Sequence, residues 1–358
     1  MSARSDPALA ALGWALAALP IAPRRALWVG ARPGLDLPFG FVLDALQDFL
    51  PWAEALRRHG QACIEPEPTD GRRGAALPQG QGLILLSPAR QREAARAESA
   101  RALAALADDG LLLAAVANDA GARTFESDLR QLCPALRVHS KHKCRVLLAR
   151  ASDREHARIA EWCRLDDARP LQTDGLVTRP LLGAPGLFAV DRIDAGSGLL
   201  IEHLPDTLGG AVADFGSGLG VLSAAALERC PRITALDLFE ASARAAALSR
   251  HNLLDARVPV QVHCCDVTAG VAGRFDAVLS NPPFHEGARS LPTLGQAFIR
   301  VAAQALRPGG ECWLVANAHL PYEAVMAECF VQVDAVASTR GFKLLRAALP
   351  RPQAGLSS

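Results

Sequence analysis

The stretch VADFGSGLG, residues 212–220, is an apolar run containing Asp214 and followed by three alternate glycines, Gly216, Gly218 and Gly220. This pattern is typical of a strand that turns sharply into a helix, because glycine adopts positive φ and lets the backbone approach a ligand closely. The free N–H groups at the start of such a helix can bind a polar ligand. Similar loops occur in dehydrogenases and in α/β proteins that bind nothing, so this stretch predicts a fold class rather than a ligand.

Outward from this loop, the second half of the chain alternates short apolar runs with helical segments, which predicts a mostly parallel sheet flanked by helices. The expected strands are 211–215, 233–238, 258–263, 275–280, 311–316, 331–336 and 342–349, and the expected helices are 219–229, 240–253, 293–306 and 321–329. Only a short turn separates the last two strands, so we expect them to pair antiparallel. The sequence therefore predicts an α/β domain of seven strands with an antiparallel last strand.

The first half of the chain shows a fainter form of the same plan. In the same order, GLILLSP (82–88) parallels FDAVLSNP (275–282), GLLLAAVAND (110–119) parallels GECWLVANA (310–318), and 125–150 parallels 322–346. We interpret this order as an internal duplication. Prolines and glycines concentrate late in 152–186, so we expect a first domain at 1–151, a linker at 152–186 and a second domain at 187–358.

Composition excludes several classes of protein. A length of 358 residues fits two domains, and a hydrophobic share of 50% with 21% charged residues indicates globular cores rather than disorder. The net charge of +1 excludes nucleic-acid binding through overall charge alone. Nine cysteines without a CxxC pair indicate neither a zinc site nor a disulfide framework, so we expect no metal. No apolar run approaches the roughly 18 residues that span a membrane, and we expect a cytoplasmic protein.

Two acidic residues are expected at neighbouring strand ends. Asp237 is expected to end the second strand, about 20 residues beyond the loop, where a carboxylate can accept both hydroxyls of a ribose of NAD or of S-adenosylmethionine. Asp266 follows the third strand and can accept a hydrogen bond from an adenine amino group. Each acid is equally compatible with a helix N-cap.

The fourth strand leads into Asn281, Pro282, Pro283 and Phe284. The oxygen of an Asn side chain and a neighbouring carbonyl can accept both hydrogen bonds of an exocyclic NH₂ group and orient its lone pair toward a methyl donor. The two prolines keep this backbone extended, and Phe284 offers a face on which a planar group can stack.

These residues resemble class I S-adenosylmethionine-dependent methyltransferases that act on planar nitrogens. Together with PGLFAVDRIDAGSGLL (185–200), GGECWLVANAHLPY (309–322) and GFKLLRA (341–347), they look like the ribosomal RNA guanine-N2 methyltransferases, and most like those of the small subunit. The resemblance implies two tandem Rossmann-like methyltransferase domains, of which the amino-terminal copy has lost its cofactor site. It implies S-adenosylmethionine as the cofactor and ribosomal RNA or the small ribosomal subunit as the partner of a monomeric enzyme.

Carried over residue by residue, the resemblance implies a cofactor site and a catalytic tetrad. Its cofactor residues are Asp214, Gly216, Gly218, Gly220, Asp237 and Asp266, and its catalytic residues are Asn281, Pro282, Pro283 and Phe284.

The first half departs from this pattern. Residues 29–34, VGARPG, lack the spaced glycines, and Pro88 is expected to be the counterpart of Asn281. We therefore expect this half to position RNA, through basic residues in a stretch, 129–152, that contains no acid: Arg137, Lys141, Lys143 and Arg145. A solvated edge strand protected by its charges would have the same composition.

The leading hypothesis is methyl transfer to the exocyclic N2 of a guanosine in 16S ribosomal RNA. Alternatives that keep the cofactor are a guanosine of 23S ribosomal RNA, adenine N6 in DNA, or the amide of a protein glutamine, since all present a similar nitrogen. An alternative of another class is a ribosome-assembly factor that binds RNA without catalysis.

Overall fold

The structure, a computed structural model, describes residues 6–19, 25–37, 41–64, 70–283, 285–286, 289–290, 292–339 and 341–351. The chain divides into two compact units: an amino-terminal unit of residues 1–168 with 184–186, and a carboxyl-terminal unit of residues 169–183 with 187–358. The segment 152–186, which the sequence indicates as a linker, is thus divided between them. Its helix α5 (His156–Trp162) buries Ile159 and Trp162 in the amino-terminal core.

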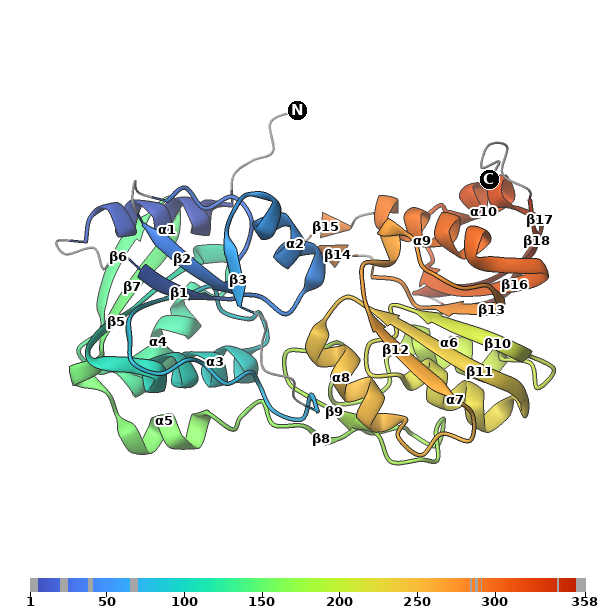
Figure 1. The fold of residues 1–358 in the computed structure, drawn as a ribbon, viewed down its shortest axis with the longest axis horizontal. Coiled ribbons are helices and arrows are strands. Elements are labelled where there is room, and N and C mark those ends of the chain that lie inside the picture. The colour runs from blue at the N-terminus through green and yellow to red at the C-terminus, as the bar shows by residue number, and fades with distance from the viewer. Residues whose placement is uncertain are drawn as a thin grey trace. The chain divides into compact units, whose positions relative to one another are not determined.

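The amino-terminal unit is a seven-stranded sheet in the order β3-β2-β1-β4-β5-β7-β6. Its strands are β1 (Arg25–Val29), β2 (Val42–Leu46), β3 (Ala62–Ile64), β4 (Gln81–Leu86), β5 (Leu106–Ala117), β6 (Arg137–Lys141) and β7 (Cys144–Arg150). Helices α1 (Pro7–Ala17) and α2 (Leu50–Arg58) lie on one face of the sheet, and α3 (Arg92–Ala105), α4 (Ala122–Leu132) and α5 lie on the other (Figure 1).

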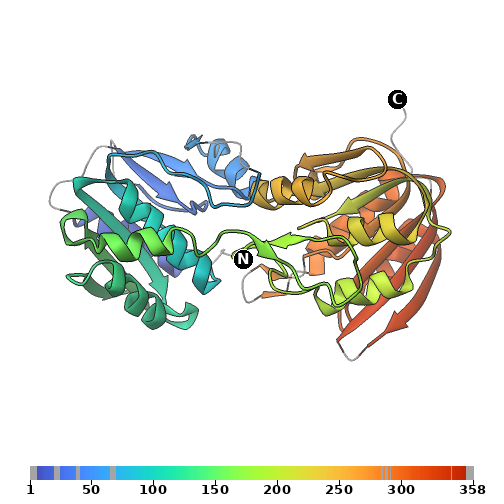
Figure 2. The ribbon, with the colours of Figure 1, turned by 90° about the horizontal axis from the view of Figure 1, so that it is seen from below.

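The carboxyl-terminal unit repeats this plan with the order β12-β11-β10-β13-β16-β18-β17. Its strands are β10 (Gly209–Phe215), β11 (Arg232–Glu240), β12 (Val260–Cys264), β13 (Phe275–Ser280), β16 (Leu306–Asn317), β17 (Phe330–Ser338) and β18 (Phe342–Pro350). Its helices are α6 (Ala195–His203), α7 (Val221–Arg229), α8 (Ala243–Asn252), α9 (Pro292–Ala305) and α10 (Tyr322–Cys329). Strands β17 and β18, red in Figure 2, pair antiparallel and end the sheet.

Short pieces complete both units. Two small ribbons pair β8 (Arg169–Pro170) with β9 (Leu182–Gly183) and β14 (His285–Glu286) with β15 (Arg289–Ser290), and short 3₁₀ turns cover Asn118–Ala120, Ala151–Asp153 and Val267–Ala269. The two seven-stranded sheets share one strand order, so the predicted fold class of two duplicated, mostly parallel α/β units is confirmed.

Strand β10 lies at the centre of its sheet, between β11 and β13. Residues Val212–Phe215 are buried because a central parallel strand is covered by helices on both faces. The chain order reverses at β10, since β11 and β12 extend to one side of it and β13 extends to the other. In open α/β sheets the crevice at the carboxyl ends of such strands is where ligands bind.

The sheet register identifies equivalent positions in the two units. Gly30 N–H donates to Leu46 O as Gly216 N–H donates to Phe239 O, so Gly30 matches Gly216 and Trp28 matches Asp214. Val29 pairs with Leu86 as Phe215 pairs with Ser280, so Ser87 matches Asn281. The expectation that Pro88 is the counterpart of Asn281 is therefore wrong by one residue: Pro88 matches Pro282.

Candidate functional site

The glycine loop links β10 to α7 at the carboxyl edge of the sheet. Gly216, Gly218 and Gly220 have φ values of +71°, +53° and +78°, which only glycine adopts without strain. A Cβ on Gly220 would lie 3.3 Å from Ser249 and Leu253, so this glycine permits packing on α8. A Cβ on Gly218 would have no described atom within 4 Å. Gly218 therefore borders open space, where a ligand fits against the bare backbone.

Asp214 lies fully buried in β10. Its Oδ2 accepts a hydrogen bond of 2.6 Å from Ser223 Oγ, whereas its Oδ1 has no partner among the described residues. Burial raises the pKa of Asp214 to about 7; the charge of Glu240 adds to this and the bond from Ser223 opposes it. A ligand that carries a positive charge would favour the ionised carboxylate.

Asp237 does not end its strand as expected, because β11 continues to Glu240. The Asp237 carboxylate accepts a hydrogen bond of 2.8 Å from His263 Nε2, and His263 stacks on Phe239 at 4.7 Å. Glu240 instead stands at the strand end and accepts hydrogen bonds of 2.8 Å from Gly218 N–H and from Ser242 N–H. Glu240 is thus the carboxylate that contacts the glycine loop, and its place two residues before the N-cap Ser242 of α8 was the sequence signal for it.

Asp266 lies just beyond β12, as expected. Its Oδ1 caps the 3₁₀ turn Val267–Ala269 by accepting hydrogen bonds of 2.8 Å from Thr268 N–H and 2.7 Å from Thr268 Oγ1. The neighbouring Cys265 N–H donates to Glu240 O at 2.9 Å, which ties this turn to the end of β11. The capping alternative considered for Asp266 is therefore realised, and its predicted adenine contact stays a prediction.

Asn281 follows β13 directly, beside the glycine loop. A Cβ on Gly216 would approach Pro283 to 3.7 Å, so the loop and the start of the tetrad lie side by side. Pro282 is buried and Pro283 is exposed. Phe284, the fourth member of the predicted tetrad, lies outside the described residues.

Three buried polar atoms at this sheet edge lack hydrogen-bond partners among the described residues: Asp214 Oδ1, Ser217 Oγ and Asn281 Oδ1. Buried polar atoms are normally satisfied, so three such atoms at the ends of two adjacent strands indicate a place for a polar ligand. The open space over Gly218 and the acids Glu240 and Asp266 lie at the ends of β10, β11 and β12. These features fit S-adenosylmethionine, which carries positive charges, ribose hydroxyls and an adenine amino group.

The equivalent edge of the amino-terminal unit is filled by the protein itself. Trp28, in the place of Asp214, is fully buried, and its Nε1 donates to Ser87 Oγ at 3.0 Å. A Cβ on Gly30 would lie 2.3 Å from Ser87 O, and Gln47 Nε2 donates to Ala31 O at 2.6 Å. In the part of this edge that the structure describes, a tryptophan replaces Asp214, and the Gly30 backbone lies against Ser87 rather than open space.

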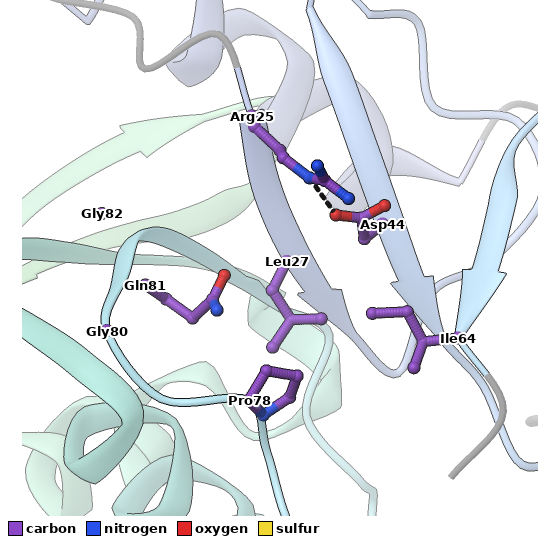
Figure 3. Close-up of a pocket in the computed structure, with 8 residues that line it drawn as sticks. All are labelled: Arg25, Leu27, Asp44, Ile64, Pro78, Gly80, Gln81 and Gly82. Atoms are coloured by element: carbon purple, nitrogen blue, oxygen red, sulfur yellow. Dashed lines mark hydrogen bonds and ion pairs between the residues drawn. The ribbon is translucent and has the colours of Figure 1, made fainter.

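A pocket of about 380 Å³ in the amino-terminal unit lies elsewhere (Figure 3). Arg25 and Gln81 line this pocket at the starting ends of β1 and β4. Asp44 also lines it and forms an ion pair of 2.5 Å with Arg25. Because ligands of such sheets bind at the carboxyl ends of the strands, this pocket is separate from the counterpart of the cofactor site.

The four predicted RNA-binding residues do not all lie on one surface of the structure. Arg137, His139 and Lys141 are spaced two residues apart in β6, so their side chains lie on one face of the strand. His139 contacts Trp14 of α1 edge-on at 6.3 Å, and Lys141 Nζ lies 5.6 Å from the Trp14 ring. Lys143 lies in the tight turn to β7, with a φ of 57°. Arg145 forms an ion pair with Glu126 of α4, an acid that precedes the acid-free stretch 129–152. Arg137 and Lys141 thus share a surface with Trp14, and Arg145 does not.

Residues 179–346 match the family model described as Methyltransferase small domain. The chain is 35% identical over 234 residues to ribosomal RNA small subunit methyltransferase C of Salmonella typhimurium strain LT2 and, with the same values, to that of Salmonella enteritidis PT4. Each alignment covers 65% of this chain and 66% of the relative. The chain belongs to the ribosomal RNA small subunit methyltransferase C family. The predicted resemblance is confirmed, as are the predicted enzyme class and cofactor, a methyltransferase that uses S-adenosylmethionine.

A solved member of this family has the same fold over nearly its whole length. The Thermus thermophilus 16S rRNA N2 methyltransferase in complex with AdoMet and guanosine matches with a TM-score of 0.79 and 24% identity, over 97% of this chain and 94% of that one. Its two-domain fold agrees with the duplicated sheets described above. Within the described part of this chain, no helix is both long and apolar enough to cross a membrane.

Proposed function

We propose that this protein transfers the methyl group of S-adenosylmethionine to the exocyclic N2 of a guanosine in 16S ribosomal RNA. The observation that carries the proposal is Asn281 Oδ1, a buried hydrogen-bond acceptor without a partner in the described structure, at the end of β13 beside the glycine loop. An exocyclic amine needs such an acceptor, because holding its N–H bonds orients its lone pair. Family membership favours ribosomal RNA over DNA or protein as the carrier of that amine, and favours an enzyme over a non-catalytic assembly factor.

The cofactor-binding residues are Gly216, Gly218, Asp214, Glu240 and Asp266. S-adenosylmethionine supplies an activated methyl group when bound. Gly218 leaves room for it, and Asp214 attracts its positive charge. Glu240 accepts from the ribose hydroxyls, in place of Asp237, because Glu240 is the residue at the strand end. Asp266 accepts from the adenine amino group through the oxygen that does not cap the turn.

The tetrad acts on the acceptor base. Asn281 Oδ1 and the Pro282 carbonyl accept the two N–H bonds of guanine N2, Pro283 keeps the backbone extended, and Phe284 stacks on the flipped base. No covalent bond to the enzyme is needed, because orientation and exclusion of water supply the rate.

The amino-terminal unit positions the RNA. Its vestigial cofactor edge is filled by Trp28 and Ser87, whereas Arg137, Lys141 and Lys143 are exposed and can meet phosphates. Trp14, 39% exposed beside Lys141, offers a ring for an unpaired base. The proposed enzyme is a monomer that acts in the cytoplasm, where ribosomal RNA is made.

The decisive experiment is to map methylated guanosines in ribosomal RNA from cells with and without the protein. We expect one N2-methylguanosine of 16S RNA to disappear in its absence, and purified protein to restore it on isolated small subunits or 16S RNA. Loss of a 23S methylation, or of none, would contradict the proposal. Light scattering of the purified protein tests whether it is a monomer in solution.

A further inference from the structure

The side-chain amide of Asn281 is held by two residues from the start of α6. Asn281 Nδ2 donates to Asp194 Oδ1 at 3.1 Å, with Oδ2 at 3.3 Å, and to Ser197 Oγ at 3.0 Å. Both N–H bonds of the amide are therefore engaged, while Asn281 Oδ1 has no described partner.

The chemistry of these partners allows one orientation of the amide. An ionised carboxylate only accepts hydrogen bonds, so it must face the NH₂ end of an Asn side chain. If the amide of Asn281 were flipped, its oxygen would lie against the Asp194 carboxylate, and two negatively charged oxygens would meet in a half-buried place. The flipped amide would also present two donors to the exocyclic NH₂ of the acceptor base, which itself needs acceptors.

The two partners are themselves fixed by the helix. Asp194 is the N-cap of α6, and its Oδ1 accepts from Gly196 N–H at 3.0 Å and Ser197 N–H at 3.1 Å. Ser197 is only 6% exposed. Because these two hydrogen bonds from the helix backbone hold the Asp194 side chain in one conformation, the orientation of the Asn281 amide is set before any substrate binds.

We propose that Asp194 and Ser197 are positioning residues that select the amide orientation of Asn281 and so direct its Oδ1 toward the exocyclic amine. This inference rests on the proposed function, because it assigns a purpose to the acceptor on which that function depends. It gives a role to the segment DAGSG (194–198), which contains no residue of the predicted site but contacts Asn281.

The test is the substitution Asp194→Asn. An Asn side chain caps a helix as well as Asp, so α6 keeps its start, but the new amide no longer dictates which end of Asn281 faces it. We expect turnover at saturating substrates to fall at least tenfold, with the affinity for S-adenosylmethionine and the KM for RNA within twofold of the parent. Ser197→Ala should lower turnover less, since one of two restraints remains. The matched control is Asp6→Asn, the N-cap of α1 that accepts from Ala8 N–H at 2.9 Å, which should leave turnover unchanged.

A second arm separates positioning from capping. In an Asn281→Asp background, Asp194 faces a like charge, so Asp194→Asn should now raise turnover, because the new NH₂ group can donate to residue 281. A role in capping alone predicts the same effect of Asp194→Asn in both backgrounds. Unchanged turnover of the single variant, or no reversal of sign in the double variant, would overturn the inference.

A different result would contradict the proposed function itself. If Asn281→Ala methylates as fast as the parent, the function assigned to Asn281 is wrong. If Asn281→Ala is slow and Asp194→Asn is not, only the positioning inference fails.

Discussion

The indole of Trp28 donates a 3.0 Å hydrogen bond to the hydroxyl of Ser87, and these two residues occupy the places that Asp214 and Asn281 hold in the other unit. This hydrogen bond fills the sheet edge of the amino-terminal unit with a large ring and satisfies the hydroxyl of the serine that stands in the place of Asn281. The two units share one strand order, but their residues at this sheet edge differ, so the edge is packed in one unit and open at Gly218 in the other.

Gly218 and Gly220 should respond differently to substitution. Gly218→Val adds a side chain to the open space over the loop and strains a φ of +53°, so we expect cofactor affinity to fall at least tenfold. Gly220→Val clashes with Ser249 and Leu253 and should lower the melting temperature instead. Calorimetry of binding and thermal unfolding together check this. An unchanged affinity of Gly218→Val for S-adenosylmethionine would mean that the cofactor does not bind at this loop.

Substitutions of Glu240 and Asp237 test which of the two carboxylates contacts the ribose hydroxyls of the cofactor. Glu240→Gln leaves one acceptor oxygen where two now serve the N–H groups of Gly218 and Ser242, and it weakens the contact to the ribose hydroxyls. The change should cost about 1.5–3 kcal/mol of binding free energy, the usual range for hydrogen bonds to a charged group. Asp237→Asn should change the affinity less than twofold, because its carboxylate is bonded to His263. The opposite order of effects, measured by calorimetry, would return the ribose contact to Asp237.

Stability should depend on pH through Asp214. Burial raises the pKa of Asp214 from 3.8 to about 7, so between these values the folded state holds a proton that the unfolded chain has lost. Its contribution is most favourable below pH 4 and declines as pH rises to 7, by about 1.4 kcal/mol per pH unit at most.

Glu98 of the amino-terminal unit, whose pKa burial also raises to about 7, acts in the same direction. Denaturant titrations across pH 4–8 should therefore show a shallower decline in Asp214→Asn than in the parent, and Glu98→Gln serves as the comparison. Identical slopes in the parent and Asp214→Asn would contradict the raised pKa of Asp214.

The RNA surface should depend on Arg137 and Lys141 rather than on Arg145. Reversing both charges, Arg137→Glu with Lys141→Glu, should weaken RNA binding and reduce its salt dependence by about two ion contacts. Arg145→Gln is the control, since that guanidinium is already paired with Glu126. RNA binding measured at several salt concentrations checks this prediction. Equal effects of the two changes would mean that the face of β6 with Arg137 and Lys141 has no special role in RNA binding.

Asn281→Ala removes one preorganised acceptor and should reduce single-turnover methylation roughly a hundredfold. Cofactor affinity should change little, because Asn281 serves the acceptor base. Phe284→Ala should instead weaken the hold on the base by about 1–3 kcal/mol, the effect of losing one stacking platform. Rates and RNA affinities measured on the same substrate separate the two roles. An Asn281→Ala enzyme as fast as the parent would make the tetrad structural.

The sequence alone determined the strands of the carboxyl-terminal unit along the chain, the antiparallel pairing of its last two strands and the position of its glycine loop. Apolar periodicity and spaced glycines depend on local rules, and the predicted strand 275–280 coincides with β13. The duplication was also readable, because the apolar runs recur in the same order in both halves.

Only the tertiary structure decided which side chains meet. Strand β11 extends to Glu240 because Phe239 and Glu240 pair with His263 and Cys264 on a neighbouring strand, a pairing that no local pattern reports. Likewise, α4 brings Glu126 to Arg145, and the cap of α6 brings Asp194 to Asn281 across 87 positions of the chain. Local propensities set where elements form, whereas contacts distant in sequence arise only when the packed sheet brings those elements together.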